Sequence, residues 1–136
     1  MSENYTLSEE LKELAEEVIN EREDLKHIIE SGVRIGYMTS NKKKKSHGMI
    51  VQGDCEKVKP KNMKFIPFDF IITFYEPHVQ FLDADKMRLL MYHELLHVGA
   101  ERSEAGELRT WVRPHNIQDF REIVDVHGLD WSEPND

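Results

Sequence analysis

Two histidines and a glutamate have the spacing of a helical metal site. The chain reads His93-Glu94-Leu95-Leu96-His97, an H-E-x-x-H pattern. Residues four apart on an α-helix lie about 40° from each other around its axis, so His93 and His97 present their imidazoles on one face. Glu94 lies at the edge of that face. The pattern predicts a Zn²⁺ site in which Glu94 is the general base that accepts a proton from a metal-activated water.

A catalytic zinc ordinarily takes three protein ligands, and three residues further along the chain are candidates for the third. His115 follows Pro114 at the start of a predicted helix and would complete a set of three imidazoles. Glu122 and Asp125 on the same predicted helix are the alternatives, and we favour His115. Asp119 is predicted to accept a hydrogen bond from a ligand histidine. Its alternative role is to stabilise the helix N-terminus.

Peptide hydrolysis also needs a donor for the charge that develops on the scissile carbonyl oxygen. Arg113 and Tyr92 are the predicted oxyanion stabilisers, with Arg109 and His78 as further candidates. The sequence does not choose among them.

The motif must be held by a buried helix. Apolar residues cover most of its circumference between residues 87 and 98. Asp83 or Asp85 is the predicted N-cap and Gly99 the predicted C-terminal stop. Residues 100–106 are predicted to be irregular, residues 108–112 extended, and residues 115–129 a closing C-terminal helix.

The N-terminal half supplies a scaffold helix and strands. Residues 7–29 have helical spacing, with Thr6 and Glu9 as a predicted capping box, an end at Ser31-Gly32, and His27 facing solvent. Residues 33–38 and 49–52 are predicted strands, joined by residues 41–48 as a hairpin connection. Residues 68–75 form a nearly continuous apolar run, which predicts a strand covered on both faces.

The lysine run and the single cysteine of this half each allow a chemical and a structural interpretation. The four lysines at residues 42–45 are predicted to be a solvated loop, with a patch for phosphate or an acidic substrate as the alternative. Cys55 is predicted to pack as a small apolar residue rather than to act as a nucleophile.

The composition limits the kinds of protein that this chain can be. The 136 residues include 39% hydrophobic and 32% charged residues with a net charge of −8, which predicts one globular domain over residues 1–136. We expect flexible ends at residues 1–5 and 132–136. No apolar run reaches transmembrane length, and a single cysteine fits a reducing compartment, so we expect a cytoplasmic protein without a membrane partner. The oligomeric state stays undetermined.

Three stretches together resemble a known family. Residues 93–99 (HELLHVG), 106–109 (GELR) and 113–120 (RPHNIQDF) are similar to the putative phage metallopeptidases, small zincin-like proteins distantly similar to SprT-like proteases. The resemblance covers roughly residues 33–131 and is specific around the histidine motifs. It implies His93, His97 and His115 as zinc ligands and Glu94 as general base. Asn116 stands where the family is expected to have an acid.

The sequence therefore predicts an α+β fold of minimal zincin type. It would have an N-terminal helix, a sheet of three or four strands, the HExxH helix and a C-terminal helix. The predicted activity is zinc-dependent hydrolysis of a protein or peptide substrate. The alternative is a catalytically silent, zinc-stabilised module that binds a protein or nucleic acid, with weak nucleic-acid contact through Lys42, Lys43, Lys44 and Lys45.

Overall fold

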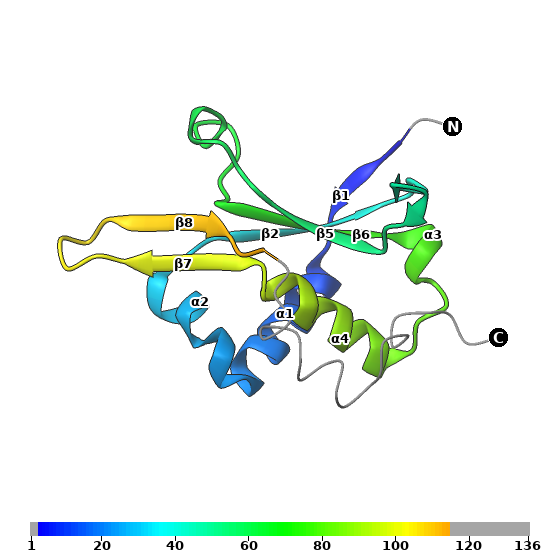
Figure 1. Cartoon of the computed structure of the whole chain (residues 1–136), viewed down its shortest axis with the longest axis horizontal. Helices are drawn as coiled ribbons and strands as arrows, with labels where there is room; N and C mark the ends of the chain where they lie inside the picture. The colour runs from blue at the N-terminus through cyan, green and yellow to red at the C-terminus, as the bar shows by residue number, and fades with distance from the viewer. Residues whose placement is uncertain (1–2, 115–136) are drawn as a thin grey trace.

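A four-stranded mixed sheet with helices on one face forms the centre of the molecule (Figure 1). The computed structural model describes residues 3–114, and the predicted α+β class is confirmed. The strands lie in the order β1 (Tyr5–Leu7), β2 (Ile35–Ser40), β6 (Phe70–Tyr75) and β5 (Gly53–Lys57). Strands β2 and β6 run parallel, whereas the two outer pairs are antiparallel. Strand β5 is therefore an edge of this sheet.

Strand β6 occupies the interior of the sheet because its side chains are apolar on both faces. Phe70, Ile72 and Phe74 are buried against the helices, and Thr73 and Tyr75 are buried on the other face. A strand of this kind needs neighbours on both sides and cover on both faces. The predicted third strand at residues 68–75 is confirmed.

The N-terminal helix begins two residues later than the sequence predicts. Helix α1 (Glu9–Glu21) is capped by Ser8, whose side chain accepts a hydrogen bond from the Leu11 amide. The prediction of Thr6 as N-cap is wrong, because Thr6 lies in β1 and pairs with Thr39 of β2. A 3₁₀ turn η1 (Glu23–Leu25) and helix α2 (Lys26–Ser31) follow. Helix α2 ends at Gly32, whose φ of 72° is the left-handed conformation that glycine adopts readily.

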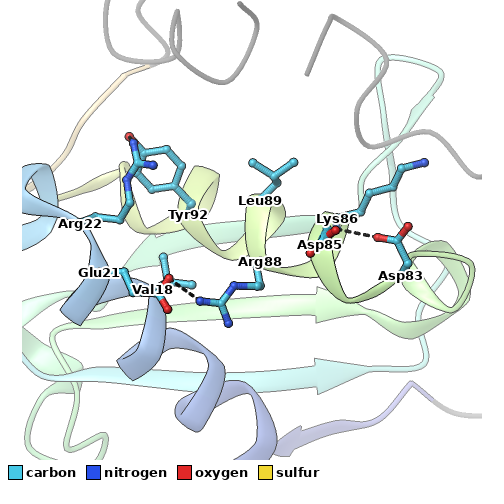
Figure 2. Close-up of a pocket in the computed structure, with 9 residues that line it drawn as sticks. All are labelled: Val18, Glu21, Arg22, Asp83, Asp85, Lys86, Arg88, Leu89 and Tyr92. Carbon is cyan, nitrogen blue, oxygen red and sulfur yellow. Dashed lines mark hydrogen bonds and ion pairs between the residues drawn. The ribbon is translucent and has the colours of Figure 1, made fainter. Parts of the chain in front are cut away.

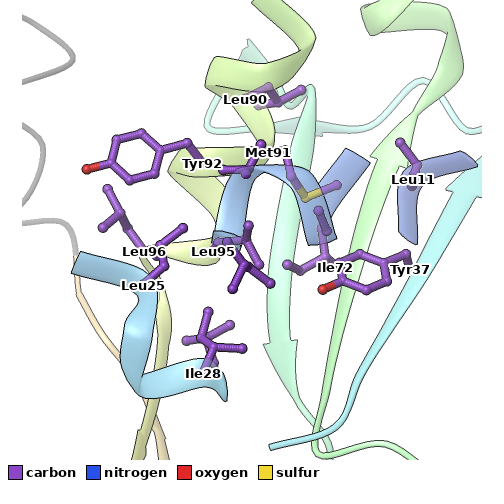
Figure 3. Packing of buried hydrophobic residues seen from close by; sticks show 14 of the residues in the cluster. Leu11, Leu25, Ile28, Tyr37, Ile72, Leu90, Met91, Tyr92, Leu95 and Leu96 are labelled. Carbon is purple, nitrogen blue, oxygen red and sulfur yellow. The ribbon is translucent and has the colours of Figure 1, made fainter. Parts of the chain in front are cut away.

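The motif helix packs its apolar side on the sheet and on α1. Helix α3 (Glu76–Val79) precedes it, and helix α4 (Ala84–Leu95) begins at Asp83, the N-cap, which accepts from the Lys86 amide. Figure 3 shows Met91 and Leu95 of α4 in one cluster with Leu11, Ile72 and Tyr37. Burying several large side chains at about 1.5–3 kcal/mol each anchors the motif to the sheet.

Helix α4 ends four residues before the predicted stop. Leu96 is the C-cap, and strand β7 (Val98–Arg102) begins at once and pairs with β8 (Leu108–Val112) in a separate antiparallel hairpin. The prediction of Gly99 as the helix stop is wrong. Irregular structure is confirmed over residues 103–106 but not over residues 100–102, which belong to β7, and the extended segment at residues 108–112 is confirmed. Gly99 lies instead under the indole ring of Trp111.

His27 does not face solvent as predicted. It is half-buried, and its Nε2 lies 2.7 Å from the carbonyl oxygen of Val98, to which it donates. Helix α2 also packs along β7. His27 therefore connects the scaffold to the first residue after the motif.

The predicted hairpin that joins residues 33–38 to residues 49–52 is also wrong, because residues 49 and 50 pair with residues 45 and 46 instead. Strands β2 and β5 do not pair with each other, because β6 lies between them. The lysine segment folds into its own small hairpin of β3 (Lys45–Ser46) and β4 (Met49–Ile50), turned by His47 and Gly48 with φ of 52° and 79°. A second loop with a 3₁₀ turn, η2 (Pro60–Asn62), joins β5 to β6.

Some predicted features lie outside the described residues. The predicted C-terminal helix at residues 115–129 and the predicted flexible tail at residues 132–136 are among them. Within residues 3–114, none of the helices combines the length and the apolar character that crossing a bilayer requires.

The contact between Gly99 and Trp111 predicts a specific loss of stability. A Cβ at position 99 would lie 2.3 Å from Nε1 of Trp111, so Gly99→Ala must displace the indole ring. We expect a loss of about 1–3 kcal/mol in the free energy of unfolding, measured by urea denaturation. In a Trp111→Ala background the same substitution should cost little, since alanine suits a strand better than glycine. Equal costs in both backgrounds would contradict the contact.

Candidate metal centre

The two motif histidines lie at the end of α4 with their rings close together. His93 is in the last turn of the helix, and His97 follows directly after it, where its amide donates to the Glu94 carbonyl oxygen over 3.1 Å. The two ring centroids are 5.3 Å apart, and the ring planes meet at 77°. The side chains predicted from the four-residue spacing are thus brought together even though His97 is no longer helical.

His97 is held by the strand that ends beside it. Its Nδ1 lies 2.7 Å from the carbonyl oxygen of Arg113, and the Arg113 amide donates to the His97 carbonyl oxygen over the same distance. A carbonyl oxygen only accepts, so Nδ1 carries the proton and Nε2 is the basic nitrogen. Histidines that bind metals ordinarily donate their second nitrogen in this way. The side chain is also buried, with 8% of its surface exposed.

Glu94 is a buried carboxyl group packed on the edge strand. It is 4% exposed, and a Cβ added to Gly53 of β5 would lie 3.5 Å from its Cγ. Burial, and after it the charge of Asp54, raise the pKa of Glu94 to about 8, while Lys44 opposes the shift. A cation held by the adjacent imidazoles would favour the ionised form. A buried carboxyl group with a shifted pKa next to two histidines is a typical feature of a functional site.

A polar cluster next to Glu94 was not predicted from the sequence. Asp54 of β5 accepts a hydrogen bond from the Tyr75 hydroxyl over 2.7 Å and forms an ion pair with Lys44. The Lys44 ammonium also lies 5.4 Å from the centre of the Tyr75 ring. Burial and Asp54 raise the pKa of Tyr75. The only sequence signal was Gly53, since a glycine inside a strand often marks the close approach of another group.

The candidate oxyanion stabilisers occupy different places. The hydroxyl of Tyr92 accepts from Arg22 over 2.7 Å and donates to Asp24. Burial and then Asp24 raise its pKa. Arg113 is half-buried, and its backbone is bonded to His97. Of the further candidates, Arg109 forms an ion pair with Glu101 at 3.3 Å, and His78 lies in α3.

Cys55 shares the helix-facing side of β5 with Gly53. It packs partly buried against the core, as predicted. Burial, followed by the charge of Glu94, raises the pKa of its thiol. A thiol that resists ionisation is a poor nucleophile, so Glu94 and the motif histidines remain the candidate residues for chemistry in this region.

A hollow of about 400 Å³ lies between α1 and α4 (Figure 2). Arg22, Arg88, Leu89 and Tyr92 contribute to its wall, and Arg88 is bound there by Glu17 and Glu21. None of the three motif residues lines it. Its polar groups are largely paired with each other, so the metal centre, and not this hollow, is the candidate site of chemistry.

The described residues fit two of the three ligand positions of a zinc site. Within residues 3–114, no three His, Cys, Asp or Glu side chains converge as a metal-binding group. The predicted third ligand, His115, and its predicted partner Asp119 lie outside the described residues, as do Glu122 and Asp125. Nε2 of His97 and the neighbouring ring of His93 are donors suited to zinc, and a buried carboxyl group lies beside them.

The family relationship agrees with this donor set. No curated protein and no solved structure matches the chain significantly. The model of one protein family matches residues 3–134, which is nearly the whole chain, and the family predicted from the histidine motifs is the same one. The chain belongs to the putative phage metallopeptidase family.

Proposed function

We propose that this metallopeptidase is a zinc enzyme in which His93, His97 and His115 bind the metal and Glu94 is the general base. One observation carries the proposal: the hydrogen bond from His97 Nδ1 to the Arg113 carbonyl oxygen. That bond leaves Nε2 of His97 with the lone pair that a zinc ligand needs, beside the ring of His93. The membership of a metallopeptidase family supports the same conclusion.

Each residue has a defined part in the proposed reaction. A bound Zn²⁺ supplies Lewis acidity toward the scissile carbonyl group and lowers the pKa of a water molecule. The ionised Glu94 carboxylate accepts the proton of the attacking water and later delivers it to the leaving amine. Burial of Glu94 keeps bulk water from competing for that proton. The Arg113 carbonyl oxygen keeps the His97 ring oriented throughout.

The edge of β5 that pairs with no strand of residues 3–114 is the proposed place for the substrate backbone. Strand β8 packs near its far end, where Lys57 Nζ donates to the Thr110 carbonyl oxygen over 2.9 Å. Gln52 accepts from Tyr75, and Val58 donates to Asp69, so the inward-bonded positions of this antiparallel pair are the even-numbered ones. The N–H and C=O groups of Gly53, Cys55 and Lys57 therefore point outward. An extended peptide can add to such an edge as another strand. Its backbone would then pass Gly53, which contacts Glu94.

For the oxyanion, we propose Arg113 in preference to Tyr92. The Tyr92 hydroxyl is already bonded to Arg22 and Asp24, and breaking those bonds would cost their energy. Arg113 follows β8 directly, and its carbonyl oxygen accepts the hydrogen bond from His97 Nδ1, so it lies next to the proposed ligand. A permanently charged guanidinium suits an oxygen that becomes negative.

Glu94→Gln is the direct test of the general base. The amide keeps the shape of the side chain but accepts no proton, so hydrolysis of unfolded protein substrates should fall at least about 100-fold. Zinc content, measured on the purified protein by metal analysis, should stay the same. The matched control is Glu13→Gln, which removes one exposed carboxylate from α1 and should leave the rate unchanged.

Full activity of Glu94→Gln would refute the assigned base. A zinc-loaded wild-type protein that cleaves no peptide or unfolded protein, yet binds a partner tightly, would favour the silent binding module. Removal of zinc by a chelator should abolish hydrolysis, and adding zinc should restore it.

The third ligand is tested by removing each candidate separately. His115→Ala should lower zinc affinity at least about 10-fold and change the visible absorption of the Co²⁺-substituted protein, because one imidazole is lost. Glu122→Gln and Asp125→Asn should leave both unchanged. His47→Asn, in an exposed turn, is the control for loss of a histidine. An unchanged Co²⁺ spectrum in His115→Ala would remove this residue from the ligand set.

A further inference from the structure

The charges of this chain are segregated along the sequence. Residues 42–64 contain eight lysines and only two acids, whereas the rest of the chain contains ten basic and twenty-four acidic residues. A protein with a net charge of −8 thus carries one strongly basic segment. Like charges collected in one region repel one another and attract a partner of opposite charge.

The fold places this basic segment at both ends of the free edge strand. Lys42, Lys43, Lys44 and Lys45 precede β4 and lead into the first end of β5, where Lys44 pairs with Asp54. Lys57 closes β5, and Lys59, Lys61 and Lys64 follow in the loop that joins β5 to β6. Figure 1 shows this loop projecting beyond one end of the sheet. The edge of β5 therefore runs between two groups of lysines.

Most of these lysines are exposed and not neutralised. Lys43, Lys45, Lys59, Lys61 and Lys64 are exposed and form no ion pair with any residue between 3 and 114. The acids gather elsewhere: α1 alone has six glutamates and one lysine, and it packs on α4 and β2 on the helical side. The positive potential is thus concentrated on the edge where the substrate backbone is proposed to lie.

Strand β5 itself carries acidic side chains. Asp54, which is paired with Lys44, and the exposed Glu56 lie on the strand, and the buried Glu94 lies against Gly53 at its first end. A continuous polyanion laid along β5 would be repelled at its centre. A chain with a neutral centre and acidic ends would meet lysines at both ends and no like charge between them.

We propose that the substrate is an acidic extended polypeptide whose carboxylates flank a neutral cleavage segment. This inference rests on the proposed peptidase function, because it uses the same edge strand. Strand β5 has five residues and spans about 16 Å, and Glu94 lies at its first end beside Gly53. The acids that meet Lys59, Lys61 and Lys64 beyond the far end therefore lie four or more residues from the scissile bond, and those that meet the lysines at residues 42–45 lie closer to it on the other side. The outward amide groups of β5 fix the peptide backbone, and the lysines select its charge.

Three peptides of equal length test the proposal. They share one neutral central segment and differ only in flanks of alternating serine with glutamate, glutamine or lysine. Binding to zinc-loaded Glu94→Gln is measured by fluorescence anisotropy, and cleavage is measured with the wild-type enzyme. We expect the acidic peptide to bind at least about 10-fold more tightly than the basic one at low salt, with the preference shrinking as salt is raised. The acidic peptide should also show the lowest KM.

A pair of double variants assigns the preference to the lysines. Lys61→Gln/Lys64→Gln should weaken binding of the acidic peptide about fivefold and leave binding of the neutral peptide unchanged. Lys12→Gln/Lys26→Gln removes the same charge from the helical side and should change neither. All four lysines are exposed, so both variants should fold.

The outcomes separate this inference from the proposed function. Equal binding of the three peptides, or equal loss in both double variants, overturns the acidic-substrate proposal even if cleavage occurs. A preference for the acidic peptide without any cleavage supports the proposed recognition of acidic chains and contradicts the proposed peptidase activity. Tighter binding of single- or double-stranded DNA than of the acidic peptide, lost in Lys61→Gln/Lys64→Gln, overturns the proposal in favour of nucleic acid.

Discussion

Two hydrogen bonds between His97 and Arg113 fix the second motif histidine of the proposed metal centre. They join the residue that follows α4 to the residue that follows β8, so the motif histidine is fixed from two sides. A histidine beyond the end of a helix would otherwise lack the orientation that an i, i+4 pair inherits from helical geometry. Here the β7–β8 hairpin supplies that orientation. The hairpin is in turn attached to the scaffold by His27, which donates to the Val98 carbonyl oxygen.

Glu94 illustrates the cost of a reactive group at a buried position. A carboxylate taken out of water is destabilised, and Asp54 adds to that effect. Lys44 offsets part of it, and so would a metal ion. The local structure thus favours the protonated form of Glu94, and a cation bound nearby would favour the ionised form that the proposed general base needs. The same apolar packing that anchors α4 to the sheet creates this situation, because Leu95 and Met91 carry the neighbouring turns into the core.

Local signals predicted the individual helices and strands better than the connections between them. The motif, the Asp83 cap, the glycine end of α2 and the apolar strand β6 all follow from residues within a few positions of each other. The end of α4 did not, because Leu95, Leu96 and Val98 form an apolar run that suits a buried helix and a buried strand equally. The insertion of β6 between β2 and β5 depends on pairing between residues far apart in sequence, which no local pattern records. The part of Arg113 was hidden for a similar reason: its contribution comes from the backbone, whereas sequence patterns point to side chains.

The free edge of β5 reconciles two opposing requirements. An exposed strand edge invites pairing with other chains and therefore aggregation, yet a peptidase of this kind needs an edge on which to lay its substrate. Natural sheets protect edges with short strands and charged residues, and β5 has both: it is five residues long and includes Asp54, Glu56 and Lys57. Charged residues protect an edge selectively, since they repel chains of like charge and attract chains of opposite charge. In the proposed function, the lysines beyond both ends of β5 and the acids on the strand both protect the edge and select the polypeptide that pairs with it.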